Sequence, residues 1–459
     1  MSQSPLQPVR QFGFWSAHFV VVSCMVGAGI LTTSGFTLQA TGNPQALLVL
    51  WGIGGLMALA GALTVAELAT MLSRAGGDYL YVRQAYGRGA GFVCGWSTFV
   101  LGFAAPTAVV STTAANYVMA GIPEQWVQHW PAWLMTHRHA LAASLLISLL
   151  TVNHCFGHRQ STRAQIISTL IKLIILVGLA SIGLFAGRGN WEHFAQGGMP
   201  SAEQWPALGV GLIYIGYAYS GWNGASYLAG EVPNPRRLLP RALISGCLAV
   251  IMLYLLLNAM FIYALDPVMM KTAPMDQVAR VAELAASQAF GDQIATPLSV
   301  ILGISLIASV SAYLLAGPRV MFAMAQDGLF FRSMGELHSR TQVPVAATLL
   351  QGLLAIAFLW SGTFLQLLDY TTVGLAALSG MTVASIFPLR RKLKDTDAYR
   401  MPWYPLPPLF YLLLTSWTIV QALLTEGKRW PTLLSLGTIL AGTLIGFINA
   451  SAKPAKLGQ

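Results

Sequence analysis

The chain has 459 residues, of which 55% are hydrophobic and only 9% are charged, and its mean hydropathy is +0.61. Because about a quarter of the residues in an ordinary soluble domain are charged, this composition excludes a soluble protein and indicates a polytopic membrane protein. The formal net charge is +10, which suggests a nucleic-acid partner only until the positions of the basic residues are considered.

Twelve segments of the chain are apolar over about 20 residues, the length that an α-helix needs to cross a bilayer. They are 12–41, 45–73, 90–120, 139–156, 163–187, 206–230, 240–265, 294–324, 343–361, 364–389, 404–425 and 430–450. With the N-terminus in the cytoplasm, 19 of the 26 Lys and Arg residues lie inside, six lie outside and one, Lys172, lies within a span. We therefore predict an all-α protein with cytoplasmic tails at 1–11 and 451–459. The net charge reflects topology, so no nucleic-acid partner is expected.

Small residues interrupt the first and the sixth apolar segments. The interruptions are Val26-Gly27-Ala28-Gly29-Ile30 and Gly216-Tyr217-Ala218-Tyr219-Ser220-Gly221-Trp222. A helix can break at membrane depth only where the freed backbone groups face protein or a cavity, and such paired breaks are typical of a transporter's binding site. We predict two five-helix repeats at 12–187 and 206–389, each opening with a broken helix, and two further helices at 404–450. An odd number of spans per repeat requires the second repeat to be inverted.

The first break offers backbone groups in place of polar side chains. Its amides, at the start of the outer half-helix, suit a carboxylate. The carbonyls of Cys24 to Val26 suit an ammonium or a cation, and the second break can supply more carbonyls. An α-amino acid would fit between them. The alternative is that the glycines only permit close helix packing, but Gly27 and Gly29 are two residues apart and do not share a helix face.

Aromatic residues accompany the second break. Tyr217 and Tyr219 lie at mid-span, where they could form a lid over a ligand, although most Tyr and Trp side chains in membrane proteins serve the interface or the core. For Trp222, packing is the favoured interpretation. The predicted substrate-binding set is therefore Val26, Gly27, Ala28, Gly29, Ile30, Tyr217, Ala218, Tyr219 and Ser220.

Lys172 lies about nine residues into the fifth segment, which places it ~13 Å from the cytoplasmic end. An ionisable residue at this depth is a functional candidate. The lysine could exchange a proton during transport, or it could stay charged and replace a sodium ion by binding carbonyls of the broken first helix. The alternative is a side chain that extends toward the interface and has no role.

Other polar residues give weaker signals. We expect Glu67 to pair with a basic loop residue and Asp369 to be solvated, and no acidic residue is expected near either break, which disfavours cationic substrates. His154 and His158 share a helix face but have no third ligand, so no metal site is predicted. The four cysteines lie in apolar segments without CxxC spacing and are expected to be free thiols. With no nucleotide-binding motif or catalytic set, neither a cofactor nor an enzyme is expected.

The chain resembles the amino-acid permeases of the amino acid–polyamine–organocation superfamily, and it is most similar to the L-type amino-acid transporter branch. The matching stretches are Val26–Ile30, Ala66-Glu67-Leu68, Arg74–Tyr79, Tyr217–Asn223, Gly230–Arg236 with Pro240, and Gly317-Pro318-Arg319 to Asp327-Gly328. The resemblance implies a LeuT-like inverted-repeat fold. It also implies that the amides of Gly27 to Ile30 bind the substrate carboxylate, that carbonyls around Tyr217, Ala218 and Ser220 bind the amine, that Tyr217 closes the outer side, and that Lys172 replaces the sodium ion.

Two residues depart from the family pattern. Ala28 stands where a serine is common, which removes one hydroxyl, and Tyr217 stands where Phe is common. Animal relatives pair with a glycoprotein through an external cysteine. Because no cysteine here lies in a predicted external loop, no disulfide-linked heavy subunit is expected, which fits a stand-alone permease of a bacterial plasma membrane.

The predicted function is sodium-independent secondary transport of neutral or small L-amino acids by alternating access. Exchange is favoured over proton symport. The alternatives are a proton-coupled symporter of amino acids or related amines and a non-transporting amino-acid sensor.

Overall fold

The computed structural model describes residues 12–451 apart from 157, 197, 199–204, 363 and 394–396. Within these residues the regular structure is entirely helical. The α-helices are α1 (Phe14–Met25), α2 (Ala28–Thr41), α3 (Pro44–Met71), α4 (Asp78–Tyr86), α5 (Arg88–Ser97), α6 (Ala105–Ala120), α7 (Glu124–Val127), α8 (Ala132–Cys155), α9 (His158–Ala186), α10 (Trp205–Ala218), α11 (Pro235–Ala264), α12 (Pro267–Thr272), α13 (Met275–Val278), α14 (Val281–Phe290), α15 (Asp292–Ser305), α16 (Ile307–Ala316), α17 (Pro318–Gln326), α18 (Val345–Ser361), α19 (Phe364–Ala384), α20 (Ile386–Lys392), α21 (Leu406–Leu424) and α22 (Arg429–Ser451). A π-helix, η1 (Thr98–Ala104), joins α5 to α6, and 3-10 helices form η2 (Trp191–Ala195), η4 (Gly224–Glu231) and η5 (Arg332–Gly335).

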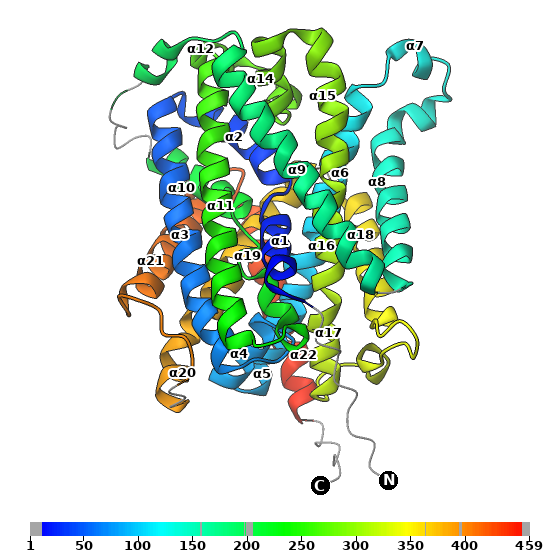
Figure 1. The fold of residues 1–459 in the computed structure, drawn as a ribbon, viewed down its shortest axis with the longest axis vertical. Coiled ribbons are helices and arrows are strands. Elements are labelled where there is room, and N and C mark those ends of the chain that lie inside the picture. The colour runs from blue at the N-terminus through cyan, green and yellow to red at the C-terminus, as the bar shows by residue number, and fades with distance from the viewer. Residues whose placement is uncertain are drawn as a thin grey trace.

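The long helices run side by side along the longest axis of the molecule (Figure 1). A helix is present at each of the twelve segments predicted from the sequence. In the described part of the chain, eight helices are long and apolar enough to cross a membrane, and α10 and α18 are shorter apolar helices. The chain is therefore an integral membrane protein. We call the end of the bundle that holds α4 the α4 end, and the opposite end, which holds α12, the α12 end (Figure 1).

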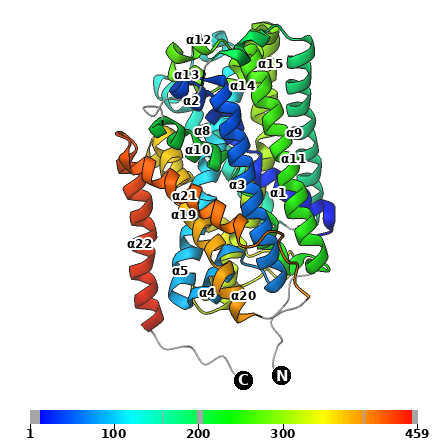
Figure 2. The same cartoon turned by 90° about the vertical axis from the view of Figure 1, so that its left-hand side faces the viewer.

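Burial separates central helices from peripheral ones. In the most apolar 18-residue stretch of α1 and α2, every residue is buried inside the protein. In the corresponding stretches of α9 and of α21, only a third of the residues are buried. Figure 2 shows α22 at the edge of the bundle. Large apolar side chains on α8 and α9, such as Leu149 (61% exposed) and Ile174 (70% exposed), point away from the protein. Acyl chains can cover such side chains, so these faces fit contact with a lipid bilayer.

Both predicted helix breaks are present. The first lies at Val26 and Gly27, between α1 and α2, so Ala28 to Ile30 already belong to the outer half-helix. The second runs from Tyr219 to Asn223, and Gly216 and Tyr217 are still helical. Gly221 has φ +97°, and a Cβ atom there would lie 2.7 Å from the backbone of Cys24. Only glycine meets both conditions, and it lets the two broken segments touch.

Two other features were not fully predicted. The third apolar segment contains the π-helix η1, and Pro106 follows it. Because proline cannot donate to the carbonyl four residues earlier, the helix must adjust its hydrogen bonds here. The connection 266–293 forms three short helices, α12 to α14, and α14 contains Glu283.

Two acidic residues outside the breaks are paired. Glu67 is fully buried and accepts two hydrogen bonds from Arg390, at 2.6 and 2.7 Å, and one from Arg400 at 3.0 Å. This confirms the expected pairing with a basic loop residue. The expectation that Asp369 is solvated was wrong, because its side chain is 11% exposed and lies 2.8 Å from Lys428 Nζ. The Asp369 pair joins α19 to the loop between α21 and α22.

Removing the Glu67 charge should destabilise the α4 end. Glu67→Gln leaves two guanidinium groups without their carboxylate, so we expect the free energy of unfolding to fall by about 2–3 kcal/mol. The expected loss is below that of a fully enclosed pair because Arg400 is 43% exposed and can reach water. Thermal unfolding in detergent measures it. Glu336→Gln is the matched control, since that carboxylate is 69% exposed and 3.9 Å from Arg332, and it should leave the melting temperature unchanged.

Candidate functional site at the two broken helices

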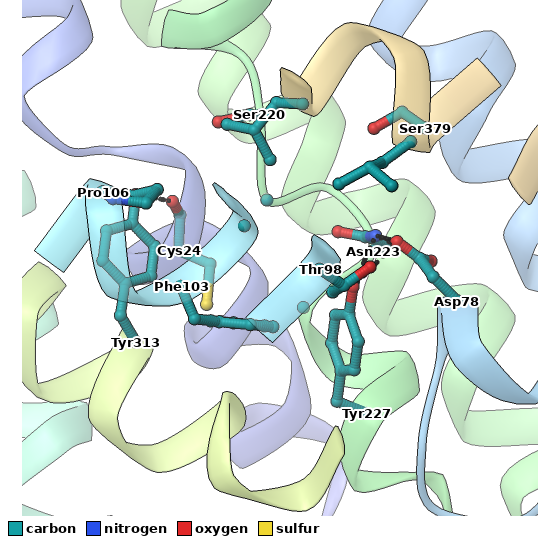
Figure 3. Close-up of a pocket in the computed structure, with 15 residues that line it drawn as sticks. Cys24, Asp78, Thr98, Phe103, Pro106, Ser220, Asn223, Tyr227, Tyr313 and Ser379 are labelled. Atoms are coloured by element: carbon teal, nitrogen blue, oxygen red, sulfur yellow. Dashed lines mark hydrogen bonds between the residues drawn. The ribbon is translucent and has the colours of Figure 1, made fainter. Parts of the chain in front are cut away.

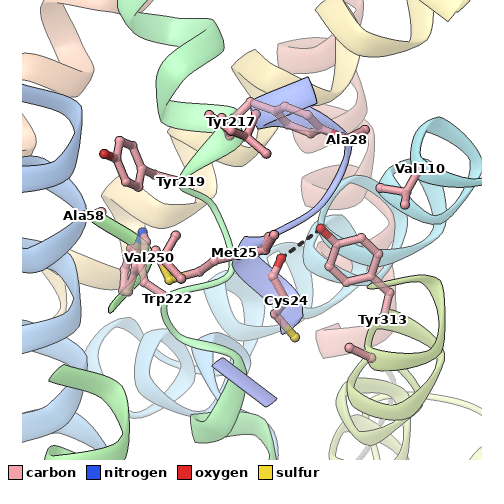
Figure 4. Packing of buried hydrophobic residues seen from close by; sticks show 14 of the residues in the cluster. Cys24, Met25, Ala28, Ala58, Val110, Tyr217, Tyr219, Trp222, Val250 and Tyr313 are labelled. Atoms are coloured by element: carbon pink, nitrogen blue, oxygen red, sulfur yellow. Dashed lines mark hydrogen bonds between the residues drawn. The ribbon is translucent and has the colours of Figure 1, made fainter. Parts of the chain in front are cut away.

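Three consecutive carbonyls end the inner half-helix α1, and each accepts a hydrogen bond from a side chain on another helix. Tyr313 Oη donates to Cys24 O at 3.0 Å (Figure 4), and Tyr254 Oη donates to Met25 O at 2.8 Å. Val26 O accepts from Lys172 and Ser309. The last carbonyls of a helix have no partner within the helix and form the negative end of its dipole. Side chains from α9, α11 and α16 therefore fix the break at α1.

Lys172 is fully buried on α9, and its ammonium lies at this break. Nζ is 2.5 Å from Val26 O and 2.9 Å from Ser309 Oγ, and Ser309 Oγ donates to the same carbonyl at 2.6 Å. No carboxylate lies within 4 Å of this ammonium among the described residues. The ammonium is held by neutral oxygens and by the helix dipole, which is the environment of a monovalent cation.

Tyr254 connects the two breaks. Its hydroxyl lies 2.8 Å from Met25 O and 3.0 Å from Ala218 O, the last residue of α10. One phenolic proton can make only one strong hydrogen bond at a time, so the two carbonyls share or exchange a single donor. The ring packs edge-on against Trp51, with centroids 5.2 Å apart. The ends of both broken helices are thus held by one side chain from α11.

The outer half-helices meet at a glycine. A Cβ atom built on Gly29 would lie 2.4 Å from the Cα of Ala218 and 2.6 Å from its Cβ. The α2 helix therefore begins directly against the end of α10, and the two helices pack together. The first amides of a helix have no acceptor within it, so those of Ala28, Gly29 and Ile30 are at the positive end of α2. The structure thus places this amide end beside Ala218, the last residue of α10.

The aromatic residues of the second break lie in different environments. Tyr217 is 5% exposed and its hydroxyl has no hydrogen-bond partner among the described residues. Tyr219 donates to Trp51 O at 3.2 Å and packs on α3, so it faces away from the first break. Trp222 packs against Tyr411, with ring centroids 5.7 Å apart, which agrees with the favoured packing interpretation. Of the three, Tyr217 is the free polar group near α2 (Figure 4).

Two cavities of about 30 Å³ flank the second break, and Ser220 lines both. Such a volume holds about one or two water molecules, so this conformation is closed around the breaks. The cavity on the α4 side is also lined by Cys24, Thr98, Asn223, Ser379 and Asp78 (Figure 3). The expectation that no acidic residue lies near either break was therefore wrong. Asp78 is remote in sequence, and α4 brings it beneath Ser220.

Sequence reasoning missed the side chains that hold the breaks. Tyr254, Ser309 and Tyr313 are polar residues inside apolar helices, and Ser309 and Tyr313 share a face of α16 at i and i+4. Such polar positions within a span are a general sign of function. Their hydroxyls are common in membrane helices, however, and only the packing shows which carbonyls they reach. The four cysteines are free, as expected, and all lie within helices.

Comparisons with known proteins identify the family of the chain. The family model described as amino acid permease matches residues 12–443. The b(0,+)-type amino acid transporter 1 of Mus musculus is 24% identical over 449 residues, which cover 96% of this chain and 88% of that protein. The serine/threonine exchanger SteT of Bacillus subtilis is 26% identical, with 91% and 92% covered, and the human large neutral amino acids transporter small subunit 2 is 26% identical, with 96% and 80% covered. The chain belongs to the amino acid permease family, as the sequence motifs indicated.

Proposed function

We propose that the chain is a sodium-independent exchanger of small or neutral L-amino acids that works by alternating access. The observation that carries this proposal is the ammonium of Lys172 against Val26 O at the end of α1. A helix end of this kind would bind a cation in a sodium-driven carrier. Here the ammonium of Lys172 would supply the positive charge, so the site would need no sodium ion from solution.

The substrate would lie between the two breaks. Its carboxylate would bind the amides of Gly27 to Ile30, and its ammonium would bind carbonyls near Tyr217, Ala218 and Ser220. The adjacent amide end of α2 and carbonyl end of α10 support this arrangement, because an α-amino acid carries the complementary charges on neighbouring atoms. Tyr217 would close the outer side. Lys172 would hold the first break in position while one amino acid leaves the site and another binds.

The proposed architecture is a LeuT-like bundle of twelve spans. Residues 12–187 and 206–389 would form two inverted five-helix repeats, and 404–450 would add two helices. The matching breaks in the first helix of each repeat support this division. The excess of basic residues in the connections at the α4 end supports a cytoplasmic location for this end and for both termini. A bacterial plasma membrane is the proposed location.

The named relatives guide the choice of substrate and mechanism. One is a serine/threonine exchanger and another is a transporter of large neutral amino acids. The name of the transporter of large neutral amino acids also describes it as a small subunit. We expect no disulfide-linked heavy subunit for this chain, since its cysteines lie in α1, α5, α8 and α11. Free amino acid and the bilayer are then its expected partners.

Uptake of labelled amino acids into proteoliposomes tests this proposal. In sodium-free choline buffer, uptake should equal that in sodium buffer and should require unlabelled amino acid inside the vesicles. Empty vesicles loaded with buffer alone are the matched control. Clear stimulation by sodium would contradict the role assigned to Lys172. Uptake into empty vesicles that follows a pH gradient would replace exchange with proton symport, and absence of any amino-acid flux would favour a sensor.

A further inference from the structure

Asp78 is a buried carboxylate at the floor of the cavity on the α4 side. It begins α4 and is 3% exposed. Asn223 Nδ2 donates to both of its oxygens, at 3.0 and 2.9 Å, and Tyr227 Oη donates to Oδ2 at 2.8 Å (Figure 3). Asn223 directly follows the second break, and Tyr227 lies in η4. The carboxylate is therefore fixed to the inner half of the broken sixth span.

The Asp78 carboxylate has no ion-pair partner among the described residues, since no basic side chain of these residues lies within 4 Å of it. The start of α4 and two neutral donors offset part of the cost of burying a charge, but a buried carboxylate usually has a cationic partner. Burial raises the pKa of Asp78 to about 6. The hydrogen bonds from Tyr227 and Asn223 lower the pKa, but their effect is smaller than that of burial. A buried carboxylate without a basic neighbour favours the approach of a positive charge.

The cavity connects this carboxylate to the proposed substrate site. Ser220 and Gly221 of the second break line it together with Cys24 of α1 and Asp78 itself. Thr98 and Ser379 add hydroxyl groups from the π-helix η1 and from α19. In the closed conformation the cavity is about 30 Å³. An amino acid is too large for this cavity, so passage of a substrate by Asp78 requires a conformation in which the α4 end is open.

We propose that Asp78 forms a second subsite, which binds the ammonium group of the amino acid on the α4 side of the breaks. This inference rests on the proposed transport function. An amino acid leaving the break would move its ammonium from the carbonyls of the sixth span to Asp78 through the cavity that both line. The subsite would be reached only from the α4 end. It would therefore determine the apparent affinity for the amino acid on that side of the membrane and leave the affinity on the other side unchanged.

Two-sided exchange kinetics test the assignment. In proteoliposomes of a single orientation, Asp78→Asn should raise KM on the α4 side about tenfold, because a charge-assisted hydrogen bond is replaced by a neutral one. KM on the α12 side should stay unchanged, which also shows that the variant is folded. Asp397→Asn, which removes an exposed carboxylate near the same end, should change neither constant. An equal rise on both sides, a change in kcat alone, or no change would overturn the proposal.

Cys24 provides a second test that does not depend on amino-acid transport, since it lines the same cavity. In a variant that retains only this cysteine, a positively charged methanethiosulfonate should react several-fold faster than a negatively charged one. Asp78→Asn should bring the ratio of the two rates close to one. An unchanged ratio would overturn the subsite. If no amino acid is exchanged but the ratio falls, the proposed function fails while the cation subsite stands.

Discussion

Lys172→Ala should reduce amino-acid exchange by about 10- to 100-fold while the protein remains folded. The ammonium satisfies Val26 O at the negative end of α1, and hydrogen bonds from charged groups contribute about 1.5–3 kcal/mol. Since about 1.4 kcal/mol corresponds to a factor of ten, losing this interaction in the transport cycle accounts for the expected loss. Exchange in proteoliposomes measures it, and gel filtration with thermal unfolding in detergent shows whether the fold survives.

Two further variants separate charge from packing. Lys172→Met keeps the length of the buried side chain and removes the ammonium, so it should be as impaired as Lys172→Ala. Lys392→Met is the matched control, because Lys392 Nζ also donates to a carbonyl, that of Ala85, at 2.8 Å. That bond lies in the α4–α20 region away from the breaks, and exchange should be retained. Full activity of Lys172→Met would make Lys172 a packing residue.

Ser309→Ala tests whether Lys172 acts alone. Val26 O accepts from both side chains, and Ser309 Oγ accepts from Lys172. Because the three groups form one network, the double variant Lys172→Met with Ser309→Ala should lose little more activity than Lys172→Met. Effects that multiply would instead indicate that the serine and the lysine act on separate steps.

The sequence was sufficient to predict the helices and both breaks. Long apolar segments, separated by basic loops, specify spans because a lipid-facing helix must satisfy its own backbone. Glycine-rich stretches in the middle of two spans indicate where the helix does not satisfy its own backbone hydrogen bonds and is interrupted. The breaks were predicted to within a few residues, although helix α10 continues through Gly216 and Tyr217. Glycine is permitted within a helix, so composition alone cannot show at which residue the hydrogen bonds end.

The side chains around the breaks were harder to predict. Lys172 was evident because a charge within a span is costly and rare. Tyr254, Tyr313 and Ser309 carry no charge, and their contacts with Met25, Cys24 and Val26 join residues more than two hundred positions apart. Asp78 was missed because it follows Gly76 and Gly77 in what reads as a loop. Its burial depends on contacts of the start of α4 with Asn223 and Tyr227, and periodicity within one segment contains no information on such packing.

Substitution of Gly29 should weaken substrate binding, and a large side chain should abolish it. A Cβ atom at this position would lie 2.4 Å from the backbone of Ala218, so even Gly29→Ala must push α2 away from α10. Overpacking of this kind costs about 1–3 kcal/mol, which corresponds to a roughly 5- to 150-fold loss of affinity. Gly29→Val adds two methyl groups to the same contact and should bind no detectable substrate. Binding is measured by the substrate-dependent rise in melting temperature of the purified protein.

The carboxylate assignment needs a control for simple misfolding and a test of its chemistry. Gly52→Ala is the control, because Gly52 is helical and nothing lies within 4 Å of the added Cβ, so affinity should be unchanged. The wild-type protein should bind an amino acid far more tightly than the methyl ester of that amino acid. Gly29→Ala should weaken binding of the acid more than binding of the ester, because the separated amide end of α2 recognises only the carboxylate. Unchanged affinity in Gly29→Val, or equal losses for acid and ester in Gly29→Ala, would exclude these amides as the carboxylate site and leave Gly29 as a packing glycine between two half-helices.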